Sequence, residues 1–196
     1  MNDRSKTRFK AIAIGVSTGG VSALKHVLGT LPADFQTPLL IVTHMTPGSD
    51  DGLAVLLNTL CSIRVKEADE REQITPGTVY LAPANYHLLV ERGGYLSLSI
   101  DSPVSFARPS VDVLFESAAE AYGPALIGVI MTGAGSDGGN GLLKIKEYGG
   151  IAIVQDPADA EMSSMPERAL QLLKADYIVR LREISPLLMK LVRENT

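Results

Sequence analysis

The sequence has few of the features that mark secreted, nucleic-acid-binding or membrane proteins. Its single cysteine, Cys61, cannot form an internal disulfide and is more typical of core packing than of a nucleophile. There is no block of lysines and arginines, and the net charge of −4 argues against binding to a phosphate backbone. No apolar run approaches the ~20 residues that span a bilayer, and residues 1–10 lack the apolar centre of a signal peptide. We therefore expect a cytoplasmic protein that neither binds nucleic acid nor inserts into a membrane.

The apolar residues that are present follow an alternation of strands and helices. A chain of 196 residues that is 45% hydrophobic can bury one sizeable core, so we expect a polar extension at 1–10 and a single domain at 11–196. Buried strands separated by amphipathic helices are typical of a parallel sheet covered on both faces. The strand-like runs are 11–14, 39–43, 63–66, 79–82, 87–90, 95–100, 125–131, 151–154 and 177–179.

The pair of runs at 87–90 and 95–100 interrupts this alternation. They flank Arg92-Gly93-Gly94, which is typical of the turn of an antiparallel hairpin. The sequence therefore predicts an α/β fold with a doubly wound, mainly parallel, Rossmann-like sheet and an antiparallel hairpin at its margin.

A glycine-rich turn follows the first strand-like run and precedes an amphipathic helix. It reads I-G-V-S-T-G-G from Ile14, with Ser17 at its centre. Such a strand-to-helix turn can expose a serine hydroxyl beside the backbone N–H groups of the next helix, which suits a nucleophile next to an oxyanion site. The same turn can also cradle a phosphate. This motif alone is compatible with both interpretations, a catalytic serine and a phosphate-binding turn.

A second glycine-rich loop follows the strongest strand signal, at 125–131. It reads T-G-A-G-S-D-G-G from Thr132, and its one acidic residue is Asp137. Many glycines let the backbone approach a ligand closely. A purely structural role for Asp137, as the N-cap of the helix that contains Leu142, is an alternative explanation.

Of the three histidines, only His44 directly follows a buried parallel strand. In open α/β sheets ligands bind at the carboxyl ends of the strands, where Ser17, His44 and Asp137 all fall. His26 lies on a helix face and His87 belongs to the hairpin, so we assign both structural roles. Asp50 and Asp51, beyond His44, are expected to cap the following helix.

Together these positions predict a serine triad. His44 would take the proton from Ser17 during attack, and Asp137 would orient the imidazole and stabilise the imidazolium. The chain order differs from the Ser, Asp/Glu, His order of α/β-hydrolases. We predict no metal and no cofactor. The candidate backbone donors to the oxyanion are Thr18, Gly19, Ala134 and Gly135.

Three polar residues lie near the start of the helix predicted at 111–118. Arg108 is a candidate for holding an anionic group of the substrate, although a salt bridge or a solvated charge is the commoner role for such a residue. Asp112 lies in the first helical turn, where the helix dipole favours a carboxylate, and we assign it that structural role. Ser110 is expected to be the N-cap.

These residues resemble the CheB methylesterase family, the catalytic domain of bacterial chemotaxis methylesterases. The resemblance covers nearly the whole chain and implies a triad at Ser17, His44 and Asp137 in a doubly wound α/β domain. It also implies that the protein hydrolyses glutamate methyl esters on the cytoplasmic domains of chemoreceptors, with possible deamidation of receptor glutamines. The motifs that carry it are I-G-V-S-T-G-G from Ile14, T-H-M from Thr43, Y-L-A-P from Tyr80, R-P-S-V-D from Arg108, T-G-A-G-S-D-G from Thr132 and M-P from Met165.

The sequence departs from the family pattern in two respects. Family members commonly have methionine at the position of Ala134, so a side-chain contribution to the oxyanion or ester is not carried over. They usually also carry an N-terminal phosphorylatable receiver domain, whereas this sequence begins ten residues before its first strand-like run. Control by phosphorylation is therefore not carried over. The chain is expected to be either a single-domain esterase that is unregulated or separately regulated, or a fragment of a longer protein, and the initial Met1 favours a natural start. The alternative hypotheses are a non-catalytic nucleotide-binding or phosphate-binding module and a receptor-array partner on the same fold.

Overall fold

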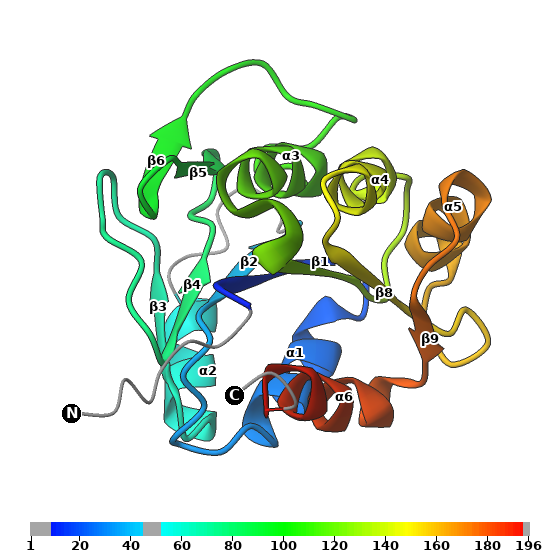
Figure 1. Ribbon diagram of the computed structural model, residues 1–196, viewed down its shortest axis with the longest axis horizontal. Helices are drawn as coiled ribbons and strands as arrows, with labels where there is room; N and C mark the ends of the chain where they lie inside the picture. The colour runs from blue at the N-terminus through cyan, green and yellow to red at the C-terminus, as the bar shows by residue number, and fades with distance from the viewer. Residues whose placement is uncertain (1–8, 45–51, 194–196) are drawn as a thin grey trace.

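A seven-stranded parallel sheet forms the centre of the computed structural model, which describes residues 9–44 and 52–193 (Figure 1). The strand order is β3-β4-β2-β1-β7-β8-β9, so the predicted doubly wound α/β class is confirmed. The strands are β1 (Ala11–Val16), β2 (Leu39–Thr43), β3 (Arg64–Glu67), β4 (Thr78–Leu81), β7 (Leu126–Ile130), β8 (Ile151–Gln155) and β9 (Tyr177–Val179).

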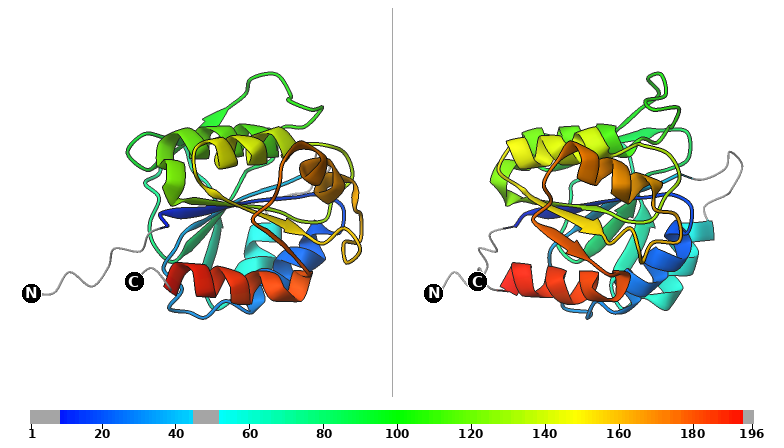
Figure 2. Two further views of the ribbon diagram at one scale, coloured as in Figure 1. Left: turned by 45° about the vertical axis from the view of Figure 1, so that its right-hand side comes forward. Right: turned by 90° about the vertical axis from the view of Figure 1, so that its right-hand side faces the viewer.

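Helices cover both faces of this sheet. Helices α1, α2 and α6 lie against one face and α3, α4 and α5 against the other (Figure 2). The buried apolar residues accordingly form two clusters, one on each side of the sheet. The helices are α1 (Gly20–Gly29), α2 (Gly52–Leu60), α3 (Val111–Tyr122), α4 (Gly139–Glu147), α5 (Ser164–Leu172) and α6 (Leu181–Arg193), with a short 3₁₀ turn at Gly123–Ala125.

The strand order reverses between β1 and β7. From β1 the chain continues to β2 on one side, whereas β7 lies on the other side of β1 and leads on to β8. The register pairs Val16 with Thr43 of β2 and Gly15 with Ile130 of β7, so these three strands end at the same edge of the sheet. This edge is the switch point at which open α/β sheets bind ligands.

The predicted hairpin is present as β5 (His87–Glu91) and β6 (Tyr95–Ser99). Its strands are antiparallel, but they form a separate two-stranded sheet and add no strand to the main one. The hairpin packs on α3, where the hydroxyl of Ser117 accepts a hydrogen bond from the backbone N–H of Val90 at 3.1 Å. The hairpin therefore forms an additional layer that covers part of α3.

Helix α5 holds Pro166 in its first turn, where the missing N–H of a proline has no intrahelical partner. The predicted caps Asp50 and Asp51 are not among the described residues. In the ranges the structure describes, no helix is long and apolar enough to cross a bilayer.

Candidate active site

Ser17 lies in the tight turn between β1 and α1. Its backbone N–H donates to the carbonyl of Thr132 at 3.0 Å, which ties the turn to the end of β7. Its own carbonyl accepts from the N–H of Gly20 at 2.8 Å. Gly19, between them, has a φ of +78°, a left-handed conformation that glycine adopts without a steric cost. The turn therefore holds Ser17 at the switch point, half-buried.

His44 directly follows β2, the strand paired with β1. Its backbone N–H donates to the carbonyl of Val16 at 3.3 Å, so His44 and Ser17 leave adjacent paired strands at the same edge. The Nε2 atom of the ring lies 2.8 Å from Oδ2 of Asp137, and the side chain is 21% exposed. With Nε2 donating to that carboxylate, Nδ1 is the nitrogen left with a lone pair.

Asp137 is the most heavily hydrogen-bonded side chain of the site. It is 2% exposed, and besides His44 it accepts hydrogen bonds from the Ser110 hydroxyl and from the N–H groups of Val111 and Asp112, at 2.7 to 3.0 Å. Burial opposes ionisation, but the donated hydrogen bonds outweigh it and hold the pKa of Asp137 below its usual value. A buried carboxylate with four donors is a fixed negative charge for the imidazole.

The structure corrects the alternative structural role considered for Asp137. The N-cap of α4 is Gly138, which has a φ of +95° and makes no side-chain cap. Asp137 instead accepts from the first N–H groups of α3, an element that begins 26 residues earlier in the chain than Asp137 itself. The N-terminal dipole of α3 therefore stabilises this carboxylate. Ser110 is confirmed as the N-cap of α3, since its hydroxyl accepts from Val113 N–H.

Asp112 is a second buried carboxyl beside the first. It is 3% exposed, and its Oδ1 accepts from the N–H of Gly141 on α4 at 2.7 Å. Burial raises the pKa of Asp112 to about 6, and the charges of Asp137 and Glu116 act in the same direction. The sequence pattern indicates for Asp112 only a position that the helix dipole favours. Its contact with α4 depends on the packing of two helices, which no local pattern reveals.

The loop after β7 is clamped between the serine turn and the start of α5. The Thr132 hydroxyl donates to the carbonyl of Thr18 at 2.9 Å and accepts from the N–H of Met162 at 2.9 Å. At Gly133 an added Cβ would lie 2.9 Å from Cβ of Ser17 and would overlap the sulfur of Met165. Gly133 is therefore required so that this loop can pass close to Ser17.

The predicted oxyanion donors lie on two sides of the site. Within residues 9–44 and 52–193, the N–H groups of Thr18, Gly19, Ala134 and Gly135 donate no hydrogen bond to the protein. Ala134 and Gly135 line a cavity of about 270 Å³ together with His44. Thr18 and Gly19 belong to the turn that carries Ser17.

Arg108 forms another part of the cavity wall. Its Nη1 donates to the carbonyls of Ile100 at 2.8 Å and Asp101 at 3.1 Å, and its buried Nε has no partner among the described residues. In that part of the chain Arg108 makes no salt bridge, so of the alternatives given for it the solvated charge and the substrate-binding role stay open. Its charge therefore reaches the cavity without a protein counter-ion from the described residues.

Comparisons with known proteins show the family to which the chain belongs. The model of the CheB methylesterase family matches residues 12–188. This chain belongs to the CheB methylesterase family. The crystal structure of the CheB methylesterase catalytic domain of Thermotoga maritima has a TM-score of 0.90 and 36% identity to it, over 94% of this chain and 99% of that one.

Two relatives illustrate the range of lengths within the CheB family. A protein of Leptospira interrogans (strain Fiocruz L1-130), provisionally named a protein-glutamate methylesterase/protein-glutamine glutaminase, is 50% identical over 95% of this chain and 97% of its own length. The enzyme of the same name from Paraburkholderia xenovorans (strain LB400) is 46% identical over 90% of this chain but 49% of its own length. The chain therefore spans nearly all of one CheB relative and about half of the other.

The CheB-family motifs that are distant in sequence meet around this site. The serine turn contacts the Thr132–Gly133 loop, that loop contacts Met165, and the R-P-S-V-D segment supplies three of the donors to Asp137. Among the described residues, no group of three or more His, Cys, Asp or Glu side chains is placed to hold a metal ion.

The two other histidines and the cysteine have different surroundings. His26 is exposed on α1. His87 is 1% exposed; its Nδ1 accepts from Ser110 N–H at 3.2 Å, so its Nε2 carries the proton donated to Ser102 carbonyl at 3.2 Å. His87 therefore joins the hairpin to the start of α3. Cys61 packs half-buried against the core, and burial raises the pKa of its thiol.

Proposed function

We propose that this chain is a serine esterase that hydrolyses glutamate methyl esters on the cytoplasmic domains of chemoreceptors. The observation that carries the proposal is the hydrogen bond between His44 and Asp137 at the end of β2, beside the Ser17 turn, in a chain that belongs to the CheB methylesterase family. The relatives named above are called protein-glutamate methylesterases, and a protein substrate follows from that name. The proposed unit is the domain at residues 11–196, acting in the cytoplasm.

The first half of the reaction forms an acyl-enzyme. The Oγ of Ser17 attacks the ester carbonyl carbon while Nδ1 of His44 takes the hydroxyl proton, because Nε2 is engaged by Asp137. The imidazolium that forms is stabilised by the ionised Asp137. N–H groups of Thr18, Gly19, Ala134 and Gly135 supply the oxyanion donors. His44 then protonates the departing methoxide, and methanol leaves.

The second half releases the glutamate side chain. A water molecule gives a proton to His44 and attacks the acyl carbon, and the Oγ of Ser17 departs with the proton returned from the imidazolium. The product is the free carboxylate. The same two steps on a glutamine side chain release ammonia in place of methanol, which corresponds to the glutaminase part of the relatives' names. Neither step uses a metal or cofactor.

Arg108 is the proposed substrate-binding residue. Its cation borders the cavity that also contains His44 and has no acidic partner among the described residues. A carboxylate of the protein substrate near the target ester would be a suitable partner for this guanidinium group. In this role Arg108 holds the substrate and takes no part in proton transfer.

The decisive experiment measures methanol released from a methylated chemoreceptor cytoplasmic domain. The wild-type chain should release methanol, and Ser17→Ala and His44→Ala should each lose about 10³-fold or more in kcat. A fluorophosphonate should label the wild-type chain and fail to label Ser17→Ala. Unchanged rates in both variants would overturn the proposal.

The nucleotide-binding alternative has its own readout. A phosphate cradle would raise the melting temperature when a nucleotide is added, since a ligand that binds only the folded state stabilises it. We expect no such shift, and the family match supports the esterase over this alternative. Saturable nucleotide binding without fluorophosphonate labelling would favour the alternative.

A further inference from the structure

The segment between β6 and α3 contains a turn with an unusual backbone. Ser105 and Phe106 have φ angles of +50° and +62°. The residues on either side, Val104 and Ala107, exchange both backbone hydrogen bonds, at 3.1 and 2.9 Å, and so close a two-residue turn. Positive φ at both central positions is the pattern of a type I′ turn, which favours Asn-Gly and disfavours bulky side chains.

This backbone is strained where the sequence places an aromatic ring. A bulky residue with positive φ is rare, because its side chain is crowded against its own backbone. The fold gains nothing from the ring in return, because the Phe106 side chain is fully exposed. A solvated phenyl ring on a strained backbone is therefore better explained by contact with another molecule than by the stability of the fold.

The turn is held firmly in place. Besides the paired backbone bonds of Val104 and Ala107, the guanidinium of Arg108 donates to the carbonyls of Ile100 and Asp101 and so fastens the two ends of the segment together. Figures 1 and 2 show the segment projecting from the body of the protein on the side of α3 and α4. Because the backbone of the turn is already held, little backbone freedom is lost when the ring is covered by a partner.

The turn borders the active site. Ser105, Phe106 and Arg108 lie along one part of the cavity wall, and Ala134 and His44 lie along another. Two further apolar side chains of the same segment, Ile100 and Val104, are exposed at 72% and 39%. The apolar patch, defined as Ile100, Val104 and Phe106 of this segment, therefore adjoins through Phe106 the cavity that is lined by His44 and Asp137.

We propose that this patch is a docking surface for the protein substrate, with Phe106 as its anchor against an apolar side chain that neighbours the glutamyl ester. The inference rests on the proposed function and adds how the substrate is recognised. A ligand small enough to fit inside the cavity leaves the solvent side of the ring uncovered, so the patch fits a protein surface. Exposed aromatic anchors of this kind contribute a large share of protein-protein affinity.

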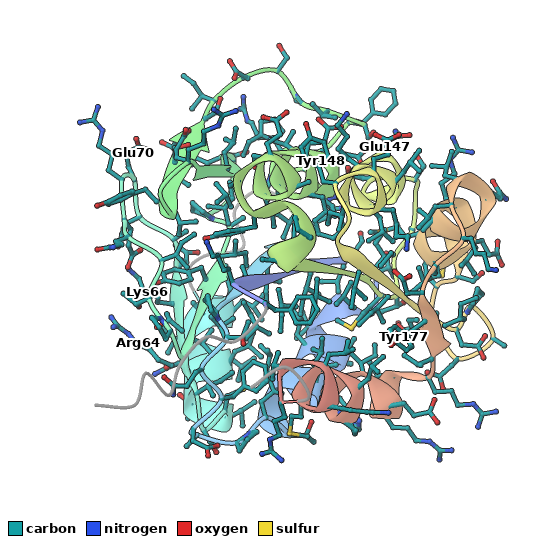
Figure 3. The ribbon with its side chains drawn as sticks, in the orientation of Figure 1. Arg64, Lys66, Glu70, Glu147, Tyr148 and Tyr177 are labelled. Carbon is teal, nitrogen blue, oxygen red and sulfur yellow. The ribbon has the colours of Figure 1, made fainter. Side chains whose placement is uncertain are left out.

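The test compares two substrates on the same variants. One substrate is a methylated receptor cytoplasmic domain, followed by methanol release, and the other is p-nitrophenyl acetate. Phe106→Gly removes the ring and suits the positive φ, so the folded state keeps or gains stability. Phe106→Tyr keeps the ring. The control is Tyr177→Ala, a partly exposed aromatic on β9 at the sheet edge opposite β3, as Figure 3 shows.

For Phe106→Gly we expect the ratio of kcat/KM on the receptor to kcat/KM on the small ester to fall about tenfold, mainly through a higher KM on the receptor. Phe106→Tyr and Tyr177→Ala should keep the wild-type ratio within about twofold. A wild-type ratio in Phe106→Gly overturns the docking inference alone. A wild-type chain that hydrolyses p-nitrophenyl acetate but releases no methanol from the receptor overturns the proposed function and this inference together.

Discussion

The hydroxyl of Ser110 donates to Oδ1 of Asp137 at 2.8 Å, and Oγ of Ser110 itself accepts from the N–H of Val113 in the first turn of α3. One small side chain thus starts a helix and supports the carboxylate that holds His44. The backbone N–H groups of Val111 and Asp112, at the same helix end, add two more donors to Asp137. The position of the candidate triad is therefore coupled to the folding of α3.

Replacing Ser110 with alanine should lower both stability and activity. The hydroxyl provides an N-cap and one charge-assisted hydrogen bond, so Ser110→Ala should lose about 1–2 kcal/mol in the free energy of unfolding. We expect kcat/KM for methanol release to fall several-fold, since three of the four donors to Asp137 remain. Urea unfolding and the methanol assay measure the two effects.

A matched control separates lost stability from lost positioning. Ser185 is 1% exposed on α6, and its hydroxyl also makes two hydrogen bonds, to the carbonyl of Val27 and with Thr30. Ser185→Ala should lose a similar free energy of unfolding while keeping wild-type kcat/KM. If Ser185→Ala lost as much activity as Ser110→Ala, the activity effect of Ser110 would reflect stability alone.

Asp137→Asn should lower both kcat and the free energy of unfolding far more than its small change in shape implies. Each carboxylate oxygen accepts two hydrogen bonds, and an amide group would direct its own N–H toward two of those donors. We expect kcat to fall about 10³-fold or more, because the wrong tautomer of His44 is then favoured, and stability at pH 7 to fall by about 2–3 kcal/mol.

The pH dependence of this variant's stability has a definite sign. The pKa of Asp137 in the folded protein is below its usual value of 3.8, so the stabilisation from its ionised form is present above pH 3.8 and is lost as the pH falls through the folded-state pKa. The stability deficit of Asp137→Asn, measured by urea unfolding, should therefore narrow below pH 3.8. A deficit that is constant with pH would contradict this assignment.

The positions of Ser17 and His44 at strand ends could be predicted from the sequence because the pattern that marks them is local. A continuous apolar run marks a buried parallel strand, and the residue after it lies at the carboxyl edge of the sheet, as Ser17 and His44 do. The hairpin was accessible for the same reason, through its strands and glycine turn. That it stands apart from the main sheet depends on its packing against α3, which has no local signature.

The hydrogen bonds that hold Asp137 and His87 could not be predicted from the sequence, because they are not local. Asp137 belongs to the loop before α4 but accepts hydrogen bonds from α3, and His87 of the hairpin accepts one from Ser110. These links join elements that are distant along the chain, so helix periodicity and capping rules point to nearer partners. The strained turn at Ser105 and Phe106 was also missed, because neither residue is one that type I′ turns favour.

Asp112→Asn should change the pH dependence of stability. Burial raises the pKa of Asp112 from 3.8 to about 6, so its contribution to stability is full below pH 3.8 and is lost as the pH rises through about 6. Asparagine does not titrate, and its carbonyl can still accept from Gly141. The free energy of unfolding of the variant minus that of the wild type should therefore increase by about 1 kcal/mol between pH 5 and pH 8.

Urea titrations at pH 5 and pH 8 measure this difference. The comparison removes any constant effect of the substitution, because only the titrating carboxyl changes between the two pH values. An equal difference at both pH values would show that Asp112 is already ionised at pH 5 in the folded protein.

Two glycine-to-alanine substitutions should change the stability of the fold in opposite directions. At Gly133 the added Cβ would lie 2.9 Å from Cβ of Ser17 and overlap the sulfur of Met165, so the loop must shift; Gly133→Ala should lose about 1–3 kcal/mol of stability and at least tenfold in kcat. At Gly29, on α1, an added Cβ meets nothing within 4 Å, and Gly29→Ala should gain up to about 1 kcal/mol with unchanged kcat. Thermal unfolding and methanol release distinguish the two. A Gly133→Ala variant with wild-type kcat would mean that the close approach of this loop to Ser17 is not needed for the reaction.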